Sequence, residues 1–380
     1  MSRKAQKWKN RQDRSMKPGK ITETMRKRTV QKQLKNRHQG IFPDLSAERV
    51  CYGISMNGKD VMIAEASRYG NQKDLGYFAL MAAVNDLAAA GAQPEAVMVR
   101  IFLTEYAYES RLKSMVEAIE AAAACADVQV MDAAAEVVPV MRSSMVHVTA
   151  VGSMASTGSA ADAACPKEQV PPEKMPPGMA AGAGRRAEMA EGIRYGQNAR
   201  DLVLTKWAGM EGTLRILEER REELSGRFVP AFLNQTAALR AYLPSIEEIR
   251  IARNMGVAAM RQVSEEGILA ALWKLAESLE AGLTVSLKAI PVRQETIEIC
   301  EYYHVNPYEM TSAGCILMAA EDGHELVKAM EERKIPAAVI GRLEEGNDRI
   351  IMRGDEISYL ERPQAEALAG CFAVWNKEEV

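Results

Sequence analysis

The sequence predicts an α/β (α+β) fold made of two domains. The chain has 380 residues, more than a single hydrophobic core usually holds. Segments with helical periodicity alternate with segments of strand length on both sides of a stretch rich in Pro, Gly and Ala. This pattern is typical of two α/β domains joined by a linker. Hydrophobic residues make up 47% and charged residues 26% of the chain, so both domains are expected to have packed cores.

The composition divides the chain into five parts. Residues 1–38 form a basic arm, 39–155 an N-terminal domain and 199–362 a C-terminal domain, and 363–380 are expected to form a tail helix. Between the domains, 156–198 contain many Pro, Gly and Ala residues and too few large apolar residues to hold one conformation. We interpret this part as a linker or flexible insertion.

The arm carries a large positive charge. It has fourteen Lys or Arg and two Asp or Glu, a net charge of +12, whereas the whole chain has −3 and the remainder therefore −15. Such an arm can contact nucleic acid or an acidic surface, with the folded part as a dimerisation platform. Charge runs are more often solvated tails, and Trp8, the only aromatic residue of the arm, offers little for base stacking. We therefore expect no nucleic-acid partner, and a short basic helix over 21–34.

Membrane and secretory proteins are not expected. No apolar run approaches the roughly 20 residues that cross a bilayer, and the polar, basic N-terminus does not resemble a signal peptide. The six cysteines are scattered without a CxxC pair, and there are only four histidines, so a clustered zinc or iron–sulfur site is not expected. We expect reduced cysteines in a cytoplasmic protein.

The N-terminal domain is expected to open with a β-hairpin over 50–65, because two alternating apolar runs flank Asn57-Gly58, a strong hairpin signal. Residues 74–91 predict a helix rich in Ala and Leu, with Asp74 as its N-cap and Gly91 at its end. The remaining elements are a strand at 96–104, a helix at 108–126 and two strands at 128–131 and 145–152.

The C-terminal domain is expected to alternate strands and helices in the same way. It begins with a strand at 202–209 and a group of helices between 211 and 254. Residues 349–360 are interpreted as a further hairpin with its turn at Gly354-Asp355. Between these parts, strands are expected at 257–263, 283–290, 315–319 and 337–342, and helices at 267–279, 295–303 and 325–333.

Two strand-to-helix junctions can carry chemistry. In the turn Gly209-Met210-Glu211-Gly212-Thr213, glycines let backbone amides approach an anion, and Thr213 adds a hydroxyl. A strand–turn–helix connection needs glycine in any case, so a structural role is the simpler interpretation. In Ser264-Glu265-Glu266-Gly267, Ser264 can cap the helix, which we favour, or Glu265 can contact a substrate.

A third candidate is Asn85-Asp86, within the Ala-rich helix. A carboxylate among Ala and Leu must reach solvent, find a partner or face a cavity. In a cavity Asp86 could hold Mg²⁺ for a nucleotide phosphate, since Mg²⁺ prefers oxygen ligands. The sequence leaves this role and plain solvent exposure equally open. It contains no GxxxxGK[ST], GxGxxG, HExxH or GxSxG motif.

Six segments, in this order, resemble the family of aminoimidazole ribonucleotide (AIR) synthase and the hydrogenase maturation factor HypE, in particular its AIR synthase-related members. They span nearly the whole chain apart from the Pro-rich part. The segments are Pro18-Gly19-Lys20-Ile21, DLGYFALMAAVNDLAAAGAQP (74–94), LTKWAGMEGT (204–213), GVAAMRQVSEEGILAALWKLAE (256–277), IPVRQETIEICEYYHVNP (290–307) and SAGCILMAA (312–320).

The resemblance implies a PurM-like architecture, with an N-terminal domain whose strands pair with a second subunit in a homodimer and a C-terminal α+β domain. It also implies that ATP and Mg²⁺ bind in a cleft between domains and subunits, where an amide or carbonyl oxygen is activated by phosphoryl transfer. The matching positions are Asn85 and Asp86, of which Asp86 is implied as a metal ligand, then Gly209, Glu211, Gly212 and Thr213, Glu265 and Gly267, and Ser312 and Gly314.

Several positions depart from the family pattern. The family's early Asp-Ala pair has no counterpart near 44–52, and its T-D pair reads Ala64-Glu65-Ala66, where Glu65 could bind a metal only with a shifted oxygen. The family's G-G-H-T-E segment reads MDAAAE at 131–136, which keeps only Glu136. Its M-H-D-V-T-E-G-G segment reads MRQVSEEG, which loses an Asp and a Gly. The chain ends in WNKEEV instead of the reactive cysteine of HypE, so the HypE reaction is not expected.

Two functions remain open from the sequence. In the first, the protein is an ATP-dependent enzyme with a divergent substrate, in which Glu265 and Glu136 act as catalytic carboxylates and Asp86 and Glu65 hold the metal. In the second, it is a catalytically degenerate member of the family that acts as a dimeric binding or regulatory protein. Each lost electrostatic contact costs about 3 kcal/mol, or roughly a hundredfold in rate. Several losses together would leave little activity unless Glu65, Asp132 and Glu136 replace the lost groups, so the sequence leaves both functions open.

Overall fold

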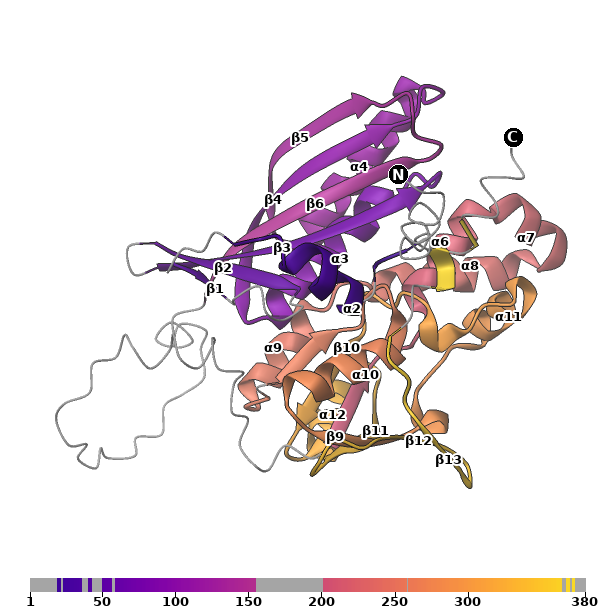
Figure 1. Ribbon diagram of the computed structural model, residues 1–380. Coiled ribbons are helices and arrows are strands. Elements are labelled where there is room, and N and C mark those ends of the chain that lie inside the picture. The colour runs from indigo at the N-terminus through magenta and orange to yellow at the C-terminus, as the bar shows by residue number, and fades with distance from the viewer. Residues whose placement is uncertain are drawn as a thin grey trace, which may run out of the picture.

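The computed structural model describes residues 19–21, 23–35, 40–42, 50–56, 59–154, 201–257, 259–363, 367–369 and 371–372. Figure 1 shows two sheets with their helices, one from each half of the chain. The predicted insertion at 156–198 lies outside the described residues, as do most of the arm and of the tail helix. In the described part of the arm, Glu23–Arg26 (α2) and Lys27–Gln31 are helical, as expected.

The N-terminal domain is a six-stranded sheet in the order β1-β2-β3-β6-β4-β5, with antiparallel neighbours except for β4 and β5. Helices α3 (Leu75–Ala89) and α4 (Glu109–Ala126) pack against one face of it (Figure 1). The side chains of alternate residues therefore point toward the helices. The strands are β1 (Ile41–Phe42), β2 (Cys51–Met56), β3 (Lys59–Gly70), β4 (Ala92–Leu103), β5 (Gln129–Val137) and β6 (Ser144–Met154).

The C-terminal domain contains a seven-stranded sheet in the order β13-β12-β9-β11-β7-β10-β8. Strands β7 and β10 lie inside this sheet and are almost wholly buried, which explains their continuous apolar sequence. The strands are β7 (Asp201–Thr205), β8 (Ala259–Gln262), β9 (Gly282–Ser286), β10 (Ile316–Ala320), β11 (Ala337–Glu344), β12 (Arg349–Arg353) and β13 (Glu356–Tyr359). The helices are α6 (Met210–Glu219), α7 (Arg221–Arg227), α8 (Pro230–Ala238), α9 (Ile246–Asn254), α10 (Gly267–Ser278), α11 (Gln294–Tyr303) and α12 (Gly323–Glu332).

The α/β fold class and the expected elements are confirmed, with some shifted ends. The two predicted hairpins form by antiparallel pairing of β2 with β3 and of β12 with β13. The strand expected at 202–209 ends earlier, because the backbone turns at Lys206 and Gly209, which have φ of 58° and 76°. Among the described residues, no helix has the length and apolarity that crossing a membrane requires.

Asp74 occupies the N-cap position of α3 as predicted but its side chain does not cap the helix, and the N-cap predicted at Ser264 is wrong. The side chain of Asp74 makes no capping hydrogen bond to α3 and instead pairs with Arg240 of the C-terminal domain, with Oδ2 2.5 Å from Nη1. Helix α10 begins after Glu266 and has no side-chain cap, so Ser264 lies too early to cap it. Pairing with a charge in the other domain competes with a local cap, and sequence spacing does not reveal that partner.

Helix α3 forms a core that both domains share. All of its residues from Leu75 to Ala88 are buried, because α3 lies between its own sheet and the C-terminal elements β8 and α9. The Asn85 amide bridges the domains: Nδ2 donates to the carbonyl oxygen of Leu243 at 2.9 Å, and Oδ1 accepts from the Ser245 amide at 3.0 Å. On β8, Gln262 Nε2 donates to the carbonyl oxygen of Ala82 at 3.0 Å. The position of each domain is therefore tied to α3.

Gly267 at the start of α10 is required by the backbone, so we expect Gly267→Ala to destabilise the protein. Its φ is +77°, and an added Cβ would lie 2.3 Å from the Tyr308 carbonyl oxygen. Left-handed strain and this clash should lower the free energy of unfolding by about 2–4 kcal/mol in urea denaturation. Gly226→Ala in α7 is the matched control, because its surroundings are open. It should be neutral or stabilising by up to about 1 kcal/mol. Equal stability of the two variants would contradict this explanation.

Candidate functional site at the domain junction

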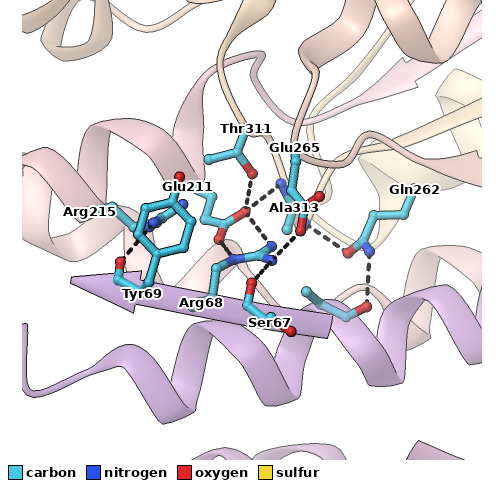
Figure 2. A network of polar contacts seen from close by, with 11 residues as sticks. Ser67, Arg68, Tyr69, Glu211, Arg215, Gln262, Glu265, Thr311 and Ala313 are labelled. Carbon is cyan, nitrogen blue, oxygen red and sulfur yellow. Dashed lines mark hydrogen bonds and ion pairs between the residues drawn. The ribbon is translucent and has the colours of Figure 1, made fainter. Parts of the chain in front are cut away.

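An arginine of the N-terminal sheet forms ion pairs with two glutamates of the C-terminal domain (Figure 2). The Arg68 guanidinium contacts both oxygens of Glu211: Nε donates to Oε1, and Nη2 donates to Oε2 at 3.0 Å. Its Nη1 donates to Glu265 Oε1 at 3.1 Å and to the Ser67 carbonyl oxygen at 2.9 Å. The side chains of Arg68 and Glu211 are 2% and 0% exposed. The two-pronged contact is thus a buried, charge-assisted link between the domains.

The Glu211 carboxylate is held on every side. Besides Arg68, its Oε2 accepts from the Thr311 hydroxyl at 2.5 Å and from the Ala313 amide at 3.2 Å. Burial by itself would raise the pKa of Glu211, but the charge and hydrogen bonds of Arg68, the charge of Arg215 and the Thr311 hydroxyl hold the pKa below its ordinary value. Glu211 is therefore a permanent anion inside the fold.

Local structure places both partners of this ion pair. Arg68 lies on the helix-facing side of β3, in register with the buried residues Met62, Ala64 and Ala66. It is near the end of β3, where the facing groups belong to the C-terminal domain. Glu211 is in the first turn of α6, where the helix dipole favours a negative charge. Each charge thus sits on a regular element, and only the packing of the domains brings the two together.

Asp86 on α3 is a second buried carboxylate at this junction. It is 5% exposed, and its Oδ1 has no hydrogen-bond partner among the described residues. Burial raises the pKa of Asp86 to about 7; the Gln262 side chain and the guanidiniums of Arg261 and Arg68 oppose this rise, and the charge of Glu265 adds to it. Asp86 therefore shares one electrostatic environment with the Arg68 ion pairs and has an acceptor oxygen without a donor.

The cysteines are free thiols wherever the structure describes them. Cys51 on β2 lies beside Asp86, and burial together with this carboxylate raises the pKa of its thiol to about 12. The pKa of Cys315 is also raised to about 12, chiefly by burial. Both thiols are therefore neutral and unreactive near pH 7.

The turn expected to bind phosphate has its polar groups engaged within the C-terminal domain. The Gly209 amide donates to Ser312 Oγ at 2.7 Å, and the Gly212 amide donates to the Thr311 carbonyl oxygen at 3.0 Å. The Thr213 hydroxyl donates to the Gly209 carbonyl oxygen at 2.8 Å and lies 3.0 Å from the Thr296 hydroxyl. These groups close the fold of the turn, as the structural interpretation of the sequence anticipated.

Two further glycines of the family motifs are explained by packing. A Cβ at Gly212 would lie 2.3 Å from Cγ of Met310. Gly314 has a φ of +94°, and a Cβ there would lie 2.9 Å from the Cα of Leu243. The hydroxyl of Ser312, two residues before this glycine, donates to the Met310 carbonyl oxygen at 2.9 Å. The residue types at these positions therefore follow from close packing in this structure, without a ligand.

Two predicted site residues lie away from the junction within one chain. Glu65 is 61% exposed on the face of the sheet opposite α3, where it lies 3.7 Å from His147 Nε2 and 3.4 Å from the Thr149 hydroxyl. The predicted metal pair of Asp86 and Glu65 is therefore not formed within one chain. Glu136 is exposed on the edge strand β5, three strands from β3. At the usual strand spacing this is about 14 Å, so Glu136 does not join Glu265 in a single chain.

Three residues that complete the junction were not predicted from the sequence: Arg68, Gln262 and Thr311. Arg68 carried a readable signal, because a charged residue at a helix-facing position of an alternating strand needs a buried counter-charge. Gln262 lies where the family has an Asp, and its amide reaches α3 in place of a charge. Thr311 is an ordinary loop residue in the sequence, and nothing in its neighbours predicts its hydrogen bond to Glu211.

The chain belongs to the AIR synthase related protein family. Residues 43–154 match the family's N-terminal domain and residues 207–353 match its C-terminal domain. The two matches cover most strands of both sheets and all the residues of the junction described above. No curated protein matches the sequence significantly.

Solved structures with the same fold include hydrogenase maturation and ThiL proteins. HypE from E. coli, a hydrogenase maturation protein, is 16% identical over 80% of this chain and 86% of its own, with a TM-score of 0.60. HypE in complex with ATP is 15% identical over 81% and 87%, with a TM-score of 0.59. ThiL complexed with AMPPCP and TMP is 15% identical over 90% and 98%, with a TM-score of 0.59. At these identities the likeness concerns the fold.

The Mg²⁺ that the family resemblance implies does not fit the residues of this junction. Mg²⁺ needs several oxygen ligands at about 2.1 Å in a nearly octahedral arrangement. Both oxygens of Glu211 accept hydrogen bonds from cationic or polar donors, and Glu265 Oε1 accepts from Arg68. Among the described residues, no group of three or more His, Cys, Asp or Glu is arranged to hold a metal ion. Asp86 Oδ1 alone is not a magnesium site.

We expect Arg68→Met to lower the free energy of unfolding by about 3–5 kcal/mol, because Glu211 would remain buried without its counter-charge. Adding Glu211→Gln to the same chain should restore part of this loss. Arg250→Met is the matched control, because its ion pair with Glu247 on α9 is about half exposed and should contribute at most about 1 kcal/mol. Urea denaturation of the variants measures all of these values. A loss at Arg68 no larger than at Arg250 would show that the buried pair does not hold the domains together.

The raised pKa of Asp86 predicts a pH-dependent cost in stability. Its ordinary value of 3.8 rises to about 7 in the folded protein, so unfolding releases a proton between about pH 4 and 7. Stability relative to Asp86→Asn should therefore fall as pH rises through this window, by up to about 4 kcal/mol in total, and level off above it. Urea denaturation of both proteins at pH 4, 5.5, 7 and 8 tests this. A difference that does not change with pH would mean that Asp86 is solvated.

Proposed function

We propose that the protein is an ATP-binding member of the AIR synthase-related family, with the nucleotide at the junction of the two domains against Asp86. One observation carries the proposal: among the described residues, Asp86 Oδ1 is a buried acceptor without a donor at the boundary of the two domains. Such a group is costly in a core. A ligand that donates a hydrogen bond, as an adenine amino group or a ribose hydroxyl can, would remove this cost.

The choice of ATP is supported by proteins of the same fold. HypE has been solved with ATP and ThiL with the analogue AMPPCP. If the protein is also an enzyme, the activity we propose is ATP-dependent activation of an amide or carbonyl oxygen. Glu265 is the candidate catalytic carboxylate, because it borders the junction and is 30% exposed, so a substrate can reach it.

A second candidate function is a binding or regulatory protein without catalysis. It is favoured by the Arg68 ion pairs, which engage Glu211 and one oxygen of Glu265 within the protein. Phosphoryl transfer depends on positioned charges around the phosphates. Carboxylates already neutralised by an internal arginine contribute little to such positioning, so this arrangement is better suited to binding than to transfer.

We further propose that the protein is a homodimer formed through the face of the N-terminal sheet that α3 and α4 leave open. Ile63, Met98 and Val151 on this face are partly or largely exposed. A second copy would cover these apolar side chains. Glu65 and His147 lie on the same face, so a partner subunit would also approach the second predicted metal ligand.

Isothermal titration calorimetry with ATP tests the proposed nucleotide site. The wild-type chain should bind ATP, and Asp86→Asn should weaken binding about 10-fold, because a neutral amide oxygen accepts a weaker hydrogen bond than a carboxylate oxygen. Asp132→Asn is the matched control: Asp132 is an exposed carboxylate paired with Arg100, away from the junction. It should bind like the wild type.

The results of this titration distinguish an ATP-dependent enzyme from a binding or regulatory protein. Binding followed by phosphate release in the presence of candidate amide substrates would support an enzyme, whereas binding without turnover would support the second function. If the wild type shows no heat of binding at millimolar ATP, the nucleotide proposal is wrong. If Asp86→Asn and Asp132→Asn bind equally well, ATP binds elsewhere.

A further inference from the structure

We propose that the ligand site at the domain junction works without a divalent metal ion, and that the Arg68 guanidinium takes the charge-neutralising place of the metal. The proposal goes beyond nucleotide binding, because it states that an anionic ligand binds as the free anion and not as a metal chelate. It rests on the proposed function only for the choice of ATP as a probe. Its basis is the charge balance and the donor arrangement of the junction.

The cationic charge at the junction is built into the chain. Arg68 is surrounded by Glu211, Glu265 and Asp86, and the Arg261 guanidinium also acts on Asp86. An arginine stays protonated at any physiological pH, so its charge does not depend on the supply of an ion. Two guanidiniums already balance the two glutamates. A divalent cation placed beside Asp86 would be repelled by both of them.

The carboxylate oxygens of Glu211 and Glu265 Oε1 also accept hydrogen bonds from donors within the protein. Arg68 uses its fork geometry on Glu211, whose Oε2 is shared with the Thr311 hydroxyl and the Ala313 amide. A metal ion would have to displace these donors to reach the same lone pairs. The register of β3 also sends Glu65 to the opposite face, so a second free carboxylate does not approach Asp86 in one chain. Asp86 is left as a hydrogen-bond acceptor for the ligand itself.

This arrangement determines the form of ligand that fits. A nucleotide would enter as the free anion, with its nucleoside part donating to Asp86, and would not need to arrive as a metal chelate. Arg68 is itself almost fully buried, so its role is to keep the surrounding carboxylates neutralised when the anion arrives. In that role it is a positioning residue.

Manganese binding to the full-length chain tests the proposal directly. Electron paramagnetic resonance measures free Mn²⁺ during titration of the wild type, Asp86→Asn and the control Asp132→Asn. All three should leave the same free Mn²⁺ concentration, with no stoichiometric site tighter than about 1 mM. A stoichiometric Mn²⁺ site that Asp86→Asn removes and Asp132→Asn retains would overturn the proposal. This measurement does not depend on nucleotide binding.

Calorimetry with ATP gives a second readout. The dissociation constant measured in excess EDTA should agree with that measured in excess Mg²⁺ within about threefold. An affinity that falls tenfold or more in EDTA would overturn the metal-free site. If ATP does not bind under either condition, the proposed nucleotide function fails, and the manganese titration alone decides whether the junction excludes divalent cations.

Discussion

The arrangement of the protein depends on a buried ion pair that neither domain could form by itself. Arg68 extends from the sheet of the N-terminal domain, and Glu211 starts a helix of the C-terminal domain. Removing two charges from water is expensive, and only a close, two-pronged contact with additional hydrogen bonds compensates for it. The two sheets must therefore meet in one relative position. That position also determines which other groups face each other across the junction.

Helix α3 shows how the same constraint shapes the candidate site. Because it is enclosed by both domains, its polar residues cannot reach solvent. Asn85 is satisfied by backbone groups of the C-terminal domain and acts as a structural bridge. The neighbouring Asp86 keeps an oxygen without a donor. Asn85 and Asp86 thus differ in how their polar atoms are satisfied. Asn85 faces backbone groups, whereas Asp86 faces the charged side chains around Arg68.

The family motifs take on a different meaning in this structure. The turn at 209–213 and the residues Ser312 and Gly314 are held by hydrogen bonds and close packing within their own domain. Their residue types are explained by the fold, whereas Asp86 and Glu265 are not fully accounted for by it. A ligand is therefore better sought against these two carboxylates than at the turn. A ligand at this place is compatible with both candidate functions, because each needs a junction that can accept an anion.

Much of the fold could be read from the sequence. Periodicity and turn signals predicted the hairpins, the helices and the two-domain division, because these features depend on residues close together in the chain. The same reasoning singled out Asp86 as a polar residue in an apolar helix. It failed for the capping hydrogen bonds expected of Asp74 and Ser264, and it could not show that Asp86 and Glu65 lie apart within one chain. In each case the outcome depends on what another element brings opposite the residue.

The sequence by itself determined the elements, the family and the polar pair Asn85-Asp86 within an apolar helix. Only the tertiary structure decided that Arg68 neutralises Glu211 and Glu265, that the glycine turn is closed, and that Glu65 lies on the far side of the sheet. The physical reason is that hydrophobic periodicity acts over a few residues along the chain, whereas charge pairing acts through space. The partners of Arg68 are 143 and 197 residues away in sequence, and no local pattern can indicate that they meet.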